Sequence, residues 1–222
     1  MEKDYWLERW EQEEIGFHQS DINPYLCQYW KELHLSQGSE VFVPLCGKSR
    51  DMLWLREQGY MVLGVELSAI GIQTFFKENG FTPNYIHSEK FNRYEANSIC
   101  ILGGNFFDLD KKDLAKVSAV YDRASLVALP LDMRESYVSH LLGILPPASQ
   151  ILLVTFDYSQ SEMSGPPFSV SVSEVDELYS EHAKICLVAR LDVLERYPRF
   201  HERGVSKLQE NIFLLTLHNK RM

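Results

Sequence analysis

One acidic side chain stands where an adenosine cofactor would need it. Glu66 ends the apolar run at 61–65 and follows Gly47 by 19 residues. A carboxylate at this place can accept hydrogen bonds from both hydroxyls of an adenosine ribose. The alternative is an acid at a helix N-terminus, which the helix dipole favours. The spacing and the preceding apolar run favour the binding role.

The turn before Glu66 is poor in glycine. Pro44-Leu45-Cys46-Gly47 follows the short apolar run at 40–43 and has one glycine where a dinucleotide-binding turn has three. Gly47-Lys48-Ser49 matches the end of a phosphate-binding loop, but that motif needs a second glycine at the place of Phe42. The match is therefore interpreted as chance. A cofactor that contains adenosine but no phosphate suits this turn, and S-adenosylmethionine is the candidate.

Two further sets of residues follow apolar runs. Arg123 comes after Asp122 at the end of the run at 117–121. This place favours a guanidinium directed into a ligand cleft about as strongly as it favours a surface ion pair. Asn105-Phe106 follows the run at 98–102 and could present a polar group and an apolar wall to adenine. The alternative is a turn residue followed by a core residue.

The N-terminal segment offers two more candidates. Trp6 and Trp10 lie on one face of a helix expected at 4–16, so Trp10 could cover a ligand or belong to a core stripe. His18 is more typical of a loop histidine than of a catalytic base.

The elements that must position these residues alternate between strands and helices. This rhythm predicts an α/β fold with a parallel sheet covered on both faces. Residues 81–97 are polar and are expected to be irregular, and 159–169 is expected to be a loop. The expected strands are 40–43, 61–65, 98–102, 117–121 and 150–156, and the expected helices are 4–16, 24–34, 49–58, 68–79 and 131–145.

The last third of the chain has a different pattern. Ser171 and Glu174 could form a capping box for a helix to about 180. Alternating apolar residues at 185–193 and a last run at 211–217 predict an antiparallel pair at the sheet edge. The connection at 194–208 is too polar to predict a crossover helix there. Without a linker or a repeat, we expect one domain over residues 1–222.

Composition excludes several classes of protein. The chain has 222 residues, 45% of them hydrophobic, which is enough for a sizeable core. Its net charge of −9 argues against nucleic acid as a partner. No run reaches the length of a membrane span or resembles a signal peptide. Four cysteines without a CxxC pair argue against zinc and disulfides and suit free thiols in a reducing cytoplasm.

Four segments together resemble the bacterial thiopurine S-methyltransferase family. They are Trp6-Leu-Glu-Arg-Trp10, Val41-Phe-Val-Pro-Leu-Cys-Gly-Lys-Ser49, Gly64-Val-Glu-Leu-Ser68 and Tyr121-Asp-Arg-Ala-Ser-Leu-Val-Ala128. The resemblance extends over about residues 4–217. It implies a class I methyltransferase (Rossmann-like) fold with a mostly parallel central sheet, an antiparallel C-terminal edge and an N-terminal lid helix. It also implies S-adenosyl-L-methionine as cofactor and S-adenosyl-L-homocysteine as product.

The resemblance also implies roles for single residues. Arg123 would serve both the cofactor and catalysis, and Arg196 and Arg203 are alternatives to Arg199 because this stretch aligns poorly. The implied cofactor contacts are Trp10, Leu45, Glu66, Asn105, Phe106 and Arg123, and the implied acceptor contacts are Phe17, His18 and Arg199.

The implied activity is methyl transfer to the sulfur of small aromatic or heterocyclic thiols, with selenium or tellurium compounds as further acceptors. A soft thiolate needs no strong general base, and a nearby arginine can favour the anionic acceptor. A monomer without nucleic-acid, membrane or metal partners is expected. Two rival hypotheses stay open, namely a non-catalytic sensor of an adenosine ligand and a Rossmann-type nicotinamide oxidoreductase.

Overall fold

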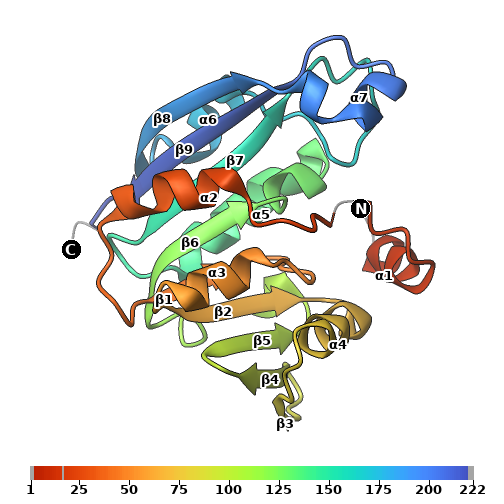
Figure 1. Cartoon of the computed structure of the whole chain (residues 1–222). Helices are drawn as coiled ribbons and strands as arrows, with labels where there is room; N and C mark the ends of the chain where they lie inside the picture. The colour runs from red at the N-terminus through yellow and green to blue at the C-terminus, as the bar shows by residue number, and fades with distance from the viewer. Residues whose placement is uncertain (1–2, 17, 220–222) are drawn as a thin grey trace. The chain divides into compact units, whose positions relative to one another are not determined.

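The computed structural model describes residues 3–16 and 18–219 (Figure 1). The chain forms two compact units, residues 1–121 and residues 122–222. Strand β6 (Val117–Arg123) contains the boundary between them. The expectation of a single domain stays a prediction.

The first unit contains the predicted parallel sheet. Strand β1 (Glu40–Val43) pairs in parallel with both β2 (Met61–Glu66) and β6, and β2 pairs in parallel with β5 (Ile99–Gly103). Their residues are almost continuously buried, as expected for parallel strands whose two faces are both covered. The strand order in this unit is β3-β4-β5-β2-β1-β6.

An antiparallel hairpin extends this sheet where the sequence predicted irregular structure. Strands β3 (Asn84–Ile86) and β4 (Asn92–Ala96) pair with each other, and β4 pairs with β5. All of β3 is exposed and only Tyr94 of β4 is buried, so no apolar alternation marks these strands. Asn97 and Ser98 both have positive φ, at 51° and 64°, which suits the tight turn that joins β4 to β5.

Two helices of the first unit, α2 (Pro24–Tyr29) and α4 (Ala69–Glu78), begin where the sequence predicted. Ser68 accepts a hydrogen bond from the Gly71 N–H at the start of α4, and Pro24 begins α2. The remaining helices and short 3₁₀ turns are α1 (Lys3–Glu11), η1 (Trp30–Leu33), α3 (Asp51–Glu57) and η2 (Phe106–Asp108).

Helix α1 is shorter than the predicted 4–16. It ends at Glu11, because Glu13 takes a left-handed conformation with φ 58° and the Glu14 N–H donates to the Arg9 carbonyl at 2.9 Å. Asp4 lies in the first turn of α1, where a negative side chain interacts favourably with the helix dipole.

A buried carboxylate ties three elements of the first unit together. Asp51, at the start of α3, accepts hydrogen bonds from the Asn23 N–H at 2.8 Å and from the Tyr121 hydroxyl at 3.0 Å. The segment before α2, the N-terminus of α3 and the strand β6 are therefore held in one arrangement.

The second unit contains the predicted antiparallel edge. Strand β9 (Gln209–Leu217) pairs antiparallel with both β7 (Gln150–Asp157) and β8 (Ala183–Asp192). Short helical segments occupy part of 194–208, where no crossover helix was predicted. The helical segments of this unit are η3 (Leu126–Ala128), α5 (Leu131–Ile144), α6 (Val172–Tyr179), η4 (Leu194–Arg196) and α7 (Pro198–Glu202).

The predicted capping box of α6 is only half formed. The Ser171 hydroxyl accepts a hydrogen bond from the Glu174 N–H at 3.2 Å, as predicted. The Glu174 carboxylate instead accepts a hydrogen bond from the Arg134 guanidinium of α5. A charge-assisted contact between helices has replaced the local one.

Candidate active site

Glu66 is held by backbone donors at the carboxyl end of β2. One carboxylate oxygen accepts the Gly47 N–H at 2.8 Å and the other accepts the Ser68 N–H at 2.8 Å. Burial raises the pKa of this carboxyl above its usual range, although the backbone donors of Ser68 and Gly47 oppose the shift. Each oxygen keeps a further lone pair, so the oriented carboxylate can accept hydrogen bonds from a diol.

The turn between β1 and α3 is a poor phosphate cradle. The Cys46 N–H donates to the Val65 carbonyl and the Ser49 N–H donates to the Cys46 carbonyl, both at 3.0 Å, while the Gly47 N–H is used by Glu66. A phosphate-binding loop directs such N–H groups at the anion instead. The donors of this turn thus fit an adenosine cofactor without phosphates better than a nucleotide.

Leu45 has an uncommon backbone conformation in the same turn. Its φ is 44°, in the left-handed region that non-glycine residues seldom adopt. Such conformations tend to occur at binding sites, where surrounding contacts maintain them. Leu45 is half-buried, and its contact with a cofactor stays a prediction.

The Trp10 indole packs against two glycines. A Cβ atom at Gly71 would lie 2.9 Å from Cζ2 of Trp10, and one at Gly47 would lie 3.4 Å from it. The indole is buried, so helix α1 lies over the Gly47 turn and the start of α4. A buried Trp10 agrees with the core-stripe alternative, and its role in covering a ligand stays a prediction. His18 is half-buried and its N–H donates to the Ile15 carbonyl, whereas Phe17 lies outside the described residues.

Asn105 and Phe106 follow β5 as predicted. The Asn105 side-chain oxygen accepts the Phe107 N–H at 3.3 Å and caps η2, while the Phe106 ring is buried. Both the turn-and-core alternative and a half-buried Asn105 beside a ligand agree with this arrangement. The adenine contact stays a prediction.

Lys48 forms an ion pair instead of pointing at an anion site. Its ammonium donates to the Glu78 carboxylate near the end of α4 at 2.7 Å, with 10% of the Lys48 side chain and 51% of the Glu78 side chain exposed. The interpretation of Gly47-Lys48-Ser49 as a chance match agrees with this contact.

We expect Lys48→Ala to leave methyl transfer within about twofold of wild type and to lower stability by about 1–2 kcal/mol, because the Lys48 side chain is only 10% exposed and its truncation also removes packing. Turnover and thermal unfolding check this, with Lys31→Ala on η1 as the control. Tight binding of ATP with magnesium that the variant loses would contradict the expectation.

Arg123 is the last residue of β6 and lies at the start of the second unit. It is half-buried, follows the fully buried Asp122, and precedes Ala124, whose φ is 74°. The Asp122 carboxylate accepts the Tyr137 hydroxyl at 2.7 Å and the Leu126 N–H at 3.3 Å. Sequence patterns assigned no role to Asp122 itself and did not single out Tyr137, which lies on the buried face of α5.

The three candidate acceptor arginines are all exposed and lie on or beside α7. Arg203 donates to the Pro166 carbonyl at 3.3 Å. A cluster of apolar side chains holds this region in place, namely Tyr158, Met163, Val193, Phe200, Val205 and Leu208. The assignment of Arg199, with Arg196 and Arg203 as alternatives, stays a prediction.

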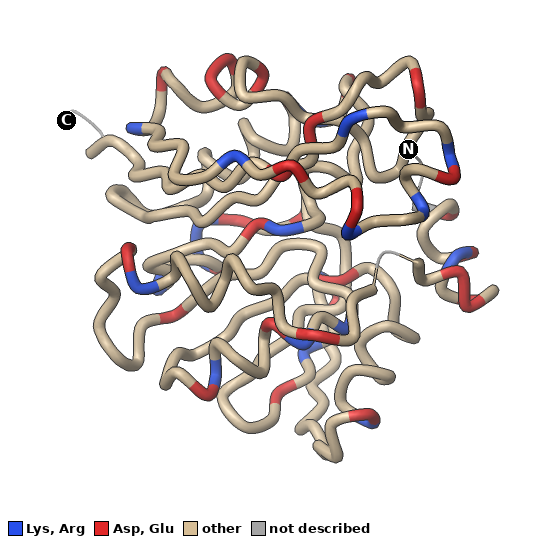
Figure 2. Tube along the Cα trace, turned by 45° about the horizontal axis from the view of Figure 1, so that its top comes forward, with Lys and Arg blue, Asp and Glu red and all other residues tan. Residues whose placement is uncertain are grey.

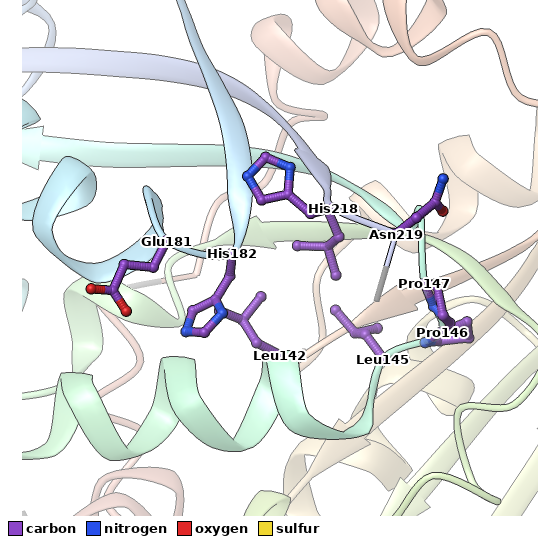
Figure 3. A pocket seen from close by; sticks show the side chains of 9 residues that line it. Leu142, Leu145, Pro146, Pro147, Glu181, His182, His218 and Asn219 are labelled. Carbon is purple, nitrogen blue, oxygen red and sulfur yellow. The ribbon is translucent and has the colours of Figure 1, made fainter. Parts of the chain in front are cut away.

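Two cavities lie away from these residues. One of about 570 Å³ in the second unit is lined by the end of α5 and the prolines after it, by Glu181 and His182 before β8, and by the end of β9. The His182 and His218 side chains point in different directions (Figure 3). One of about 310 Å³ in the first unit lies at the amino ends of β1 and β2. None of the predicted site residues that the structure describes lines either cavity.

No cysteine is an obvious nucleophile. Burial raises the pKa of the Cys46 thiol, and it raises that of Cys100 to about 12.

Within residues 3–16 and 18–219, no group of three potential ligands is arranged to hold a metal ion. No helix among the described residues is long and apolar enough to cross a membrane.

Comparison with solved structures agrees with the class I methyltransferase fold. A 1,6-didemethyltoxoflavin-N1-methyltransferase of Burkholderia thailandensis superposes with a TM-score of 0.63 at 14% identity, over 98% of this chain and 87% of that one. A SAM-dependent methyltransferase of Methanosarcina mazei gives a TM-score of 0.63 at 14% identity, over 90% of this chain and 100% of that one. At such identities these likenesses show the fold.

Sequence comparison identifies the family. A thiopurine S-methyltransferase of Nitrosospira multiformis is 63% identical over 97% of this chain and 98% of its own length. One of Pseudomonas paraeruginosa is 49% identical over 97% of this chain and 99% of its own. The family profile for thiopurine S-methyltransferase matches residues 1–218. This chain therefore belongs to the thiopurine S-methyltransferase family.

Proposed function

We propose that this protein transfers a methyl group from S-adenosylmethionine to the sulfur of small aromatic or heterocyclic thiols, and to related selenium or tellurium compounds. The observation that carries the proposal is the buried, backbone-held Glu66 carboxylate in a chain of this family. The relatives are named thiopurine S-methyltransferase, and the Burkholderia thailandensis neighbour is described with bound S-adenosylhomocysteine.

The residues of the first unit fit this cofactor. Glu66 accepts the ribose hydroxyls, since its oxygens are fixed by Gly47 and Ser68 and keep acceptor capacity. The glycine-poor turn leaves no set of N–H groups for a pyrophosphate, which disfavours a nicotinamide cofactor. The Trp10 indole packs against Gly47, whose N–H donates to Glu66, and limits the access of water there. When bound, S-adenosylmethionine supplies a sulfonium methyl group that an acceptor sulfur attacks.

The remaining work is orientation and charge. Holding the two reactants in line can supply roughly 7–11 kcal/mol of the barrier reduction. Arg123 stabilises an anionic acceptor or the cofactor carboxylate. Aromatic thiols ionise readily, so no strong general base is needed. The protein's own Cys46 and Cys100 thiols do not compete as nucleophiles, because burial raises the pKa of both.

The expected partners are small molecules. The chain has a net charge of −9, and its basic residues are spread among acidic ones in the described part of the chain (Figure 2). Such a charge distribution repels a phosphate backbone and supports the expectation that the protein does not bind nucleic acid. The four free cysteines support a reducing cytoplasm. A monomer is the simplest assembly for a site built on one chain.

Turnover measurements test the proposal. Purified protein is incubated with S-adenosylmethionine and a panel of aromatic thiols and chalcogen compounds, and S-adenosylhomocysteine and methylated product are measured. Product formed with aromatic thiols is the expected result. S-adenosylhomocysteine binding without turnover on any acceptor would favour the sensor hypothesis, and reduction of a substrate with a nicotinamide cofactor would favour the oxidoreductase.

A further inference from the structure

A buried polar cluster underlies the loop that begins at Arg123. Its members are Asp122, Ser125, Tyr137 and Tyr179, each 0% exposed. Burying so many polar groups lowers stability unless they are hydrogen-bonded. None of these four residues has a role in the proposed chemistry. The burial of so many polar side chains therefore calls for another explanation.

Asp122 is the centre of the cluster. One oxygen accepts the Tyr137 hydroxyl at 2.7 Å and the other accepts the Leu126 N–H at 3.3 Å. Ser125 also hydrogen-bonds to this carboxylate through its hydroxyl and its backbone. The Asp122 carboxylate therefore links α5 to Ser125 and Leu126, at the far end of the short segment 123–126.

The same helix holds the far end of the loop. Arg134 lies one turn before Tyr137 on α5, and its Nε donates to the Leu129 carbonyl at 2.9 Å. Arg134 is itself anchored by the Glu174 carboxylate on α6, and the Phe168 N–H donates to the Val127 carbonyl at 2.7 Å. Ala124, between Asp122 and Ser125, has a left-handed conformation that neighbouring contacts must maintain.

We propose that Tyr137 is a positioning residue for methyl transfer, which acts through Asp122 to fix the backbone that presents Arg123. The proposal rests on the proposed function, because it takes Arg123 as the group that meets the cofactor or the acceptor. The hydroxyl is the essential part, since it is the donor from α5 to a carboxylate that would otherwise lose its side-chain link to that helix. Loss of this link would let segment 123–126 relax and would misplace the guanidinium.

Tyr179 supplies a matched control. It is a tyrosine of the same cluster and equally buried, but its hydroxyl has no hydrogen-bond partner among the described residues. Removing an unpartnered buried hydroxyl should be neutral or stabilising. Tyr137→Phe and Tyr179→Phe therefore make the same chemical change with opposite expectations.

We expect Tyr137→Phe to lower kcat/KM about tenfold, which is the usual effect of losing a hydrogen bond to a charged group, while Tyr179→Phe stays within about twofold of wild type. Ser125→Ala, which removes another donor to Asp122, should lower kcat/KM in the same direction. In an Arg123→Ala background, Tyr137→Phe should add less than about a twofold loss, because both changes act on one group. If the two losses in kcat/KM instead multiply, Tyr137 does not act through Arg123 and its role is merely structural.

Amide hydrogen exchange at Leu126 gives a readout apart from activity. Exchange should quicken in folded Tyr137→Phe and stay at the wild-type rate in Tyr179→Phe. Equal kcat/KM and equal exchange in the two variants would overturn the inference and leave the proposed function intact. A wild-type protein without methyl transfer would instead refute the proposed function, and the exchange comparison would still decide whether Tyr137 fixes the loop.

Discussion

Glu66→Ala is expected to weaken the binding of S-adenosylhomocysteine by about tenfold or more. The ribose hydroxyls lose their charged acceptor, and losing hydrogen bonds to a charged group costs roughly 1.5–3 kcal/mol in all. The variant also frees the Gly47 and Ser68 N–H groups, which the carboxylate now accepts at 2.8 Å. The turn itself should therefore loosen along with the ribose contact.

Calorimetric titration with S-adenosylhomocysteine measures the effect in folded protein. Glu66→Gln, which keeps the shape but offers one acceptor oxygen, should fall between wild type and Glu66→Ala. Glu95→Ala on β4 is the control, since Glu95 pairs with the Arg93 guanidinium in the same unit. Unchanged binding by folded Glu66→Ala would remove Glu66 from the site.

The same carboxyl predicts a pH dependence. Burial raises the pKa of Glu66 above the usual 4.5, so the group takes up a proton at a higher pH than an exposed glutamate does. The ribose hydroxyls bind the ionised form, and the affinity of wild type should therefore fall as the pH drops through this raised pKa. Glu66→Ala should show a flat profile across the same range. Parallel profiles for the two proteins would assign the pH dependence to another group.

Arg123→Ala is expected to lower kcat/KM about 100-fold, because the guanidinium both favours the anionic acceptor and holds it in place for in-line attack on the methyl group. Arg123→Lys should lose much of its kcat/KM as well, because lysine keeps the charge but lacks the planar fork of donors. Arg56→Ala, which removes a guanidinium lying over the Phe81 ring, is a control for the general loss of an arginine.

Kinetics and calorimetry together locate the action of Arg123. If the guanidinium acts on the acceptor, affinity for S-adenosylhomocysteine holds while turnover falls. If it binds the cofactor carboxylate, both fall together. Wild-type kinetics in folded Arg123→Ala would show that this arginine serves only at the surface, and the catalytic arginine would then have to be sought near α7.

Local signals in the sequence determined much of the fold and part of the candidate site. Continuous apolar runs marked the parallel strands, and Ser68 and Pro24 marked helix starts, because each of these features acts through residues a few positions away. Glu66 was identifiable because a strand end, a turn and a fixed spacing coincide in one stretch of chain. The family resemblance added the roles that no local pattern carries.

Tertiary structure alone decided the remaining features. Hairpin β3–β4 is held by the pairing of β4 with β5 and has no buried face of its own. Its strands therefore lack apolar alternation, and the polar segment 81–97 did not predict them. The packing of Trp10 on Gly71 and the bond from Tyr137 to Asp122 join residues that are distant in sequence. Such contacts depend on the packing of the whole unit, since a buried donor finds its acceptor only after the elements that carry both have been placed.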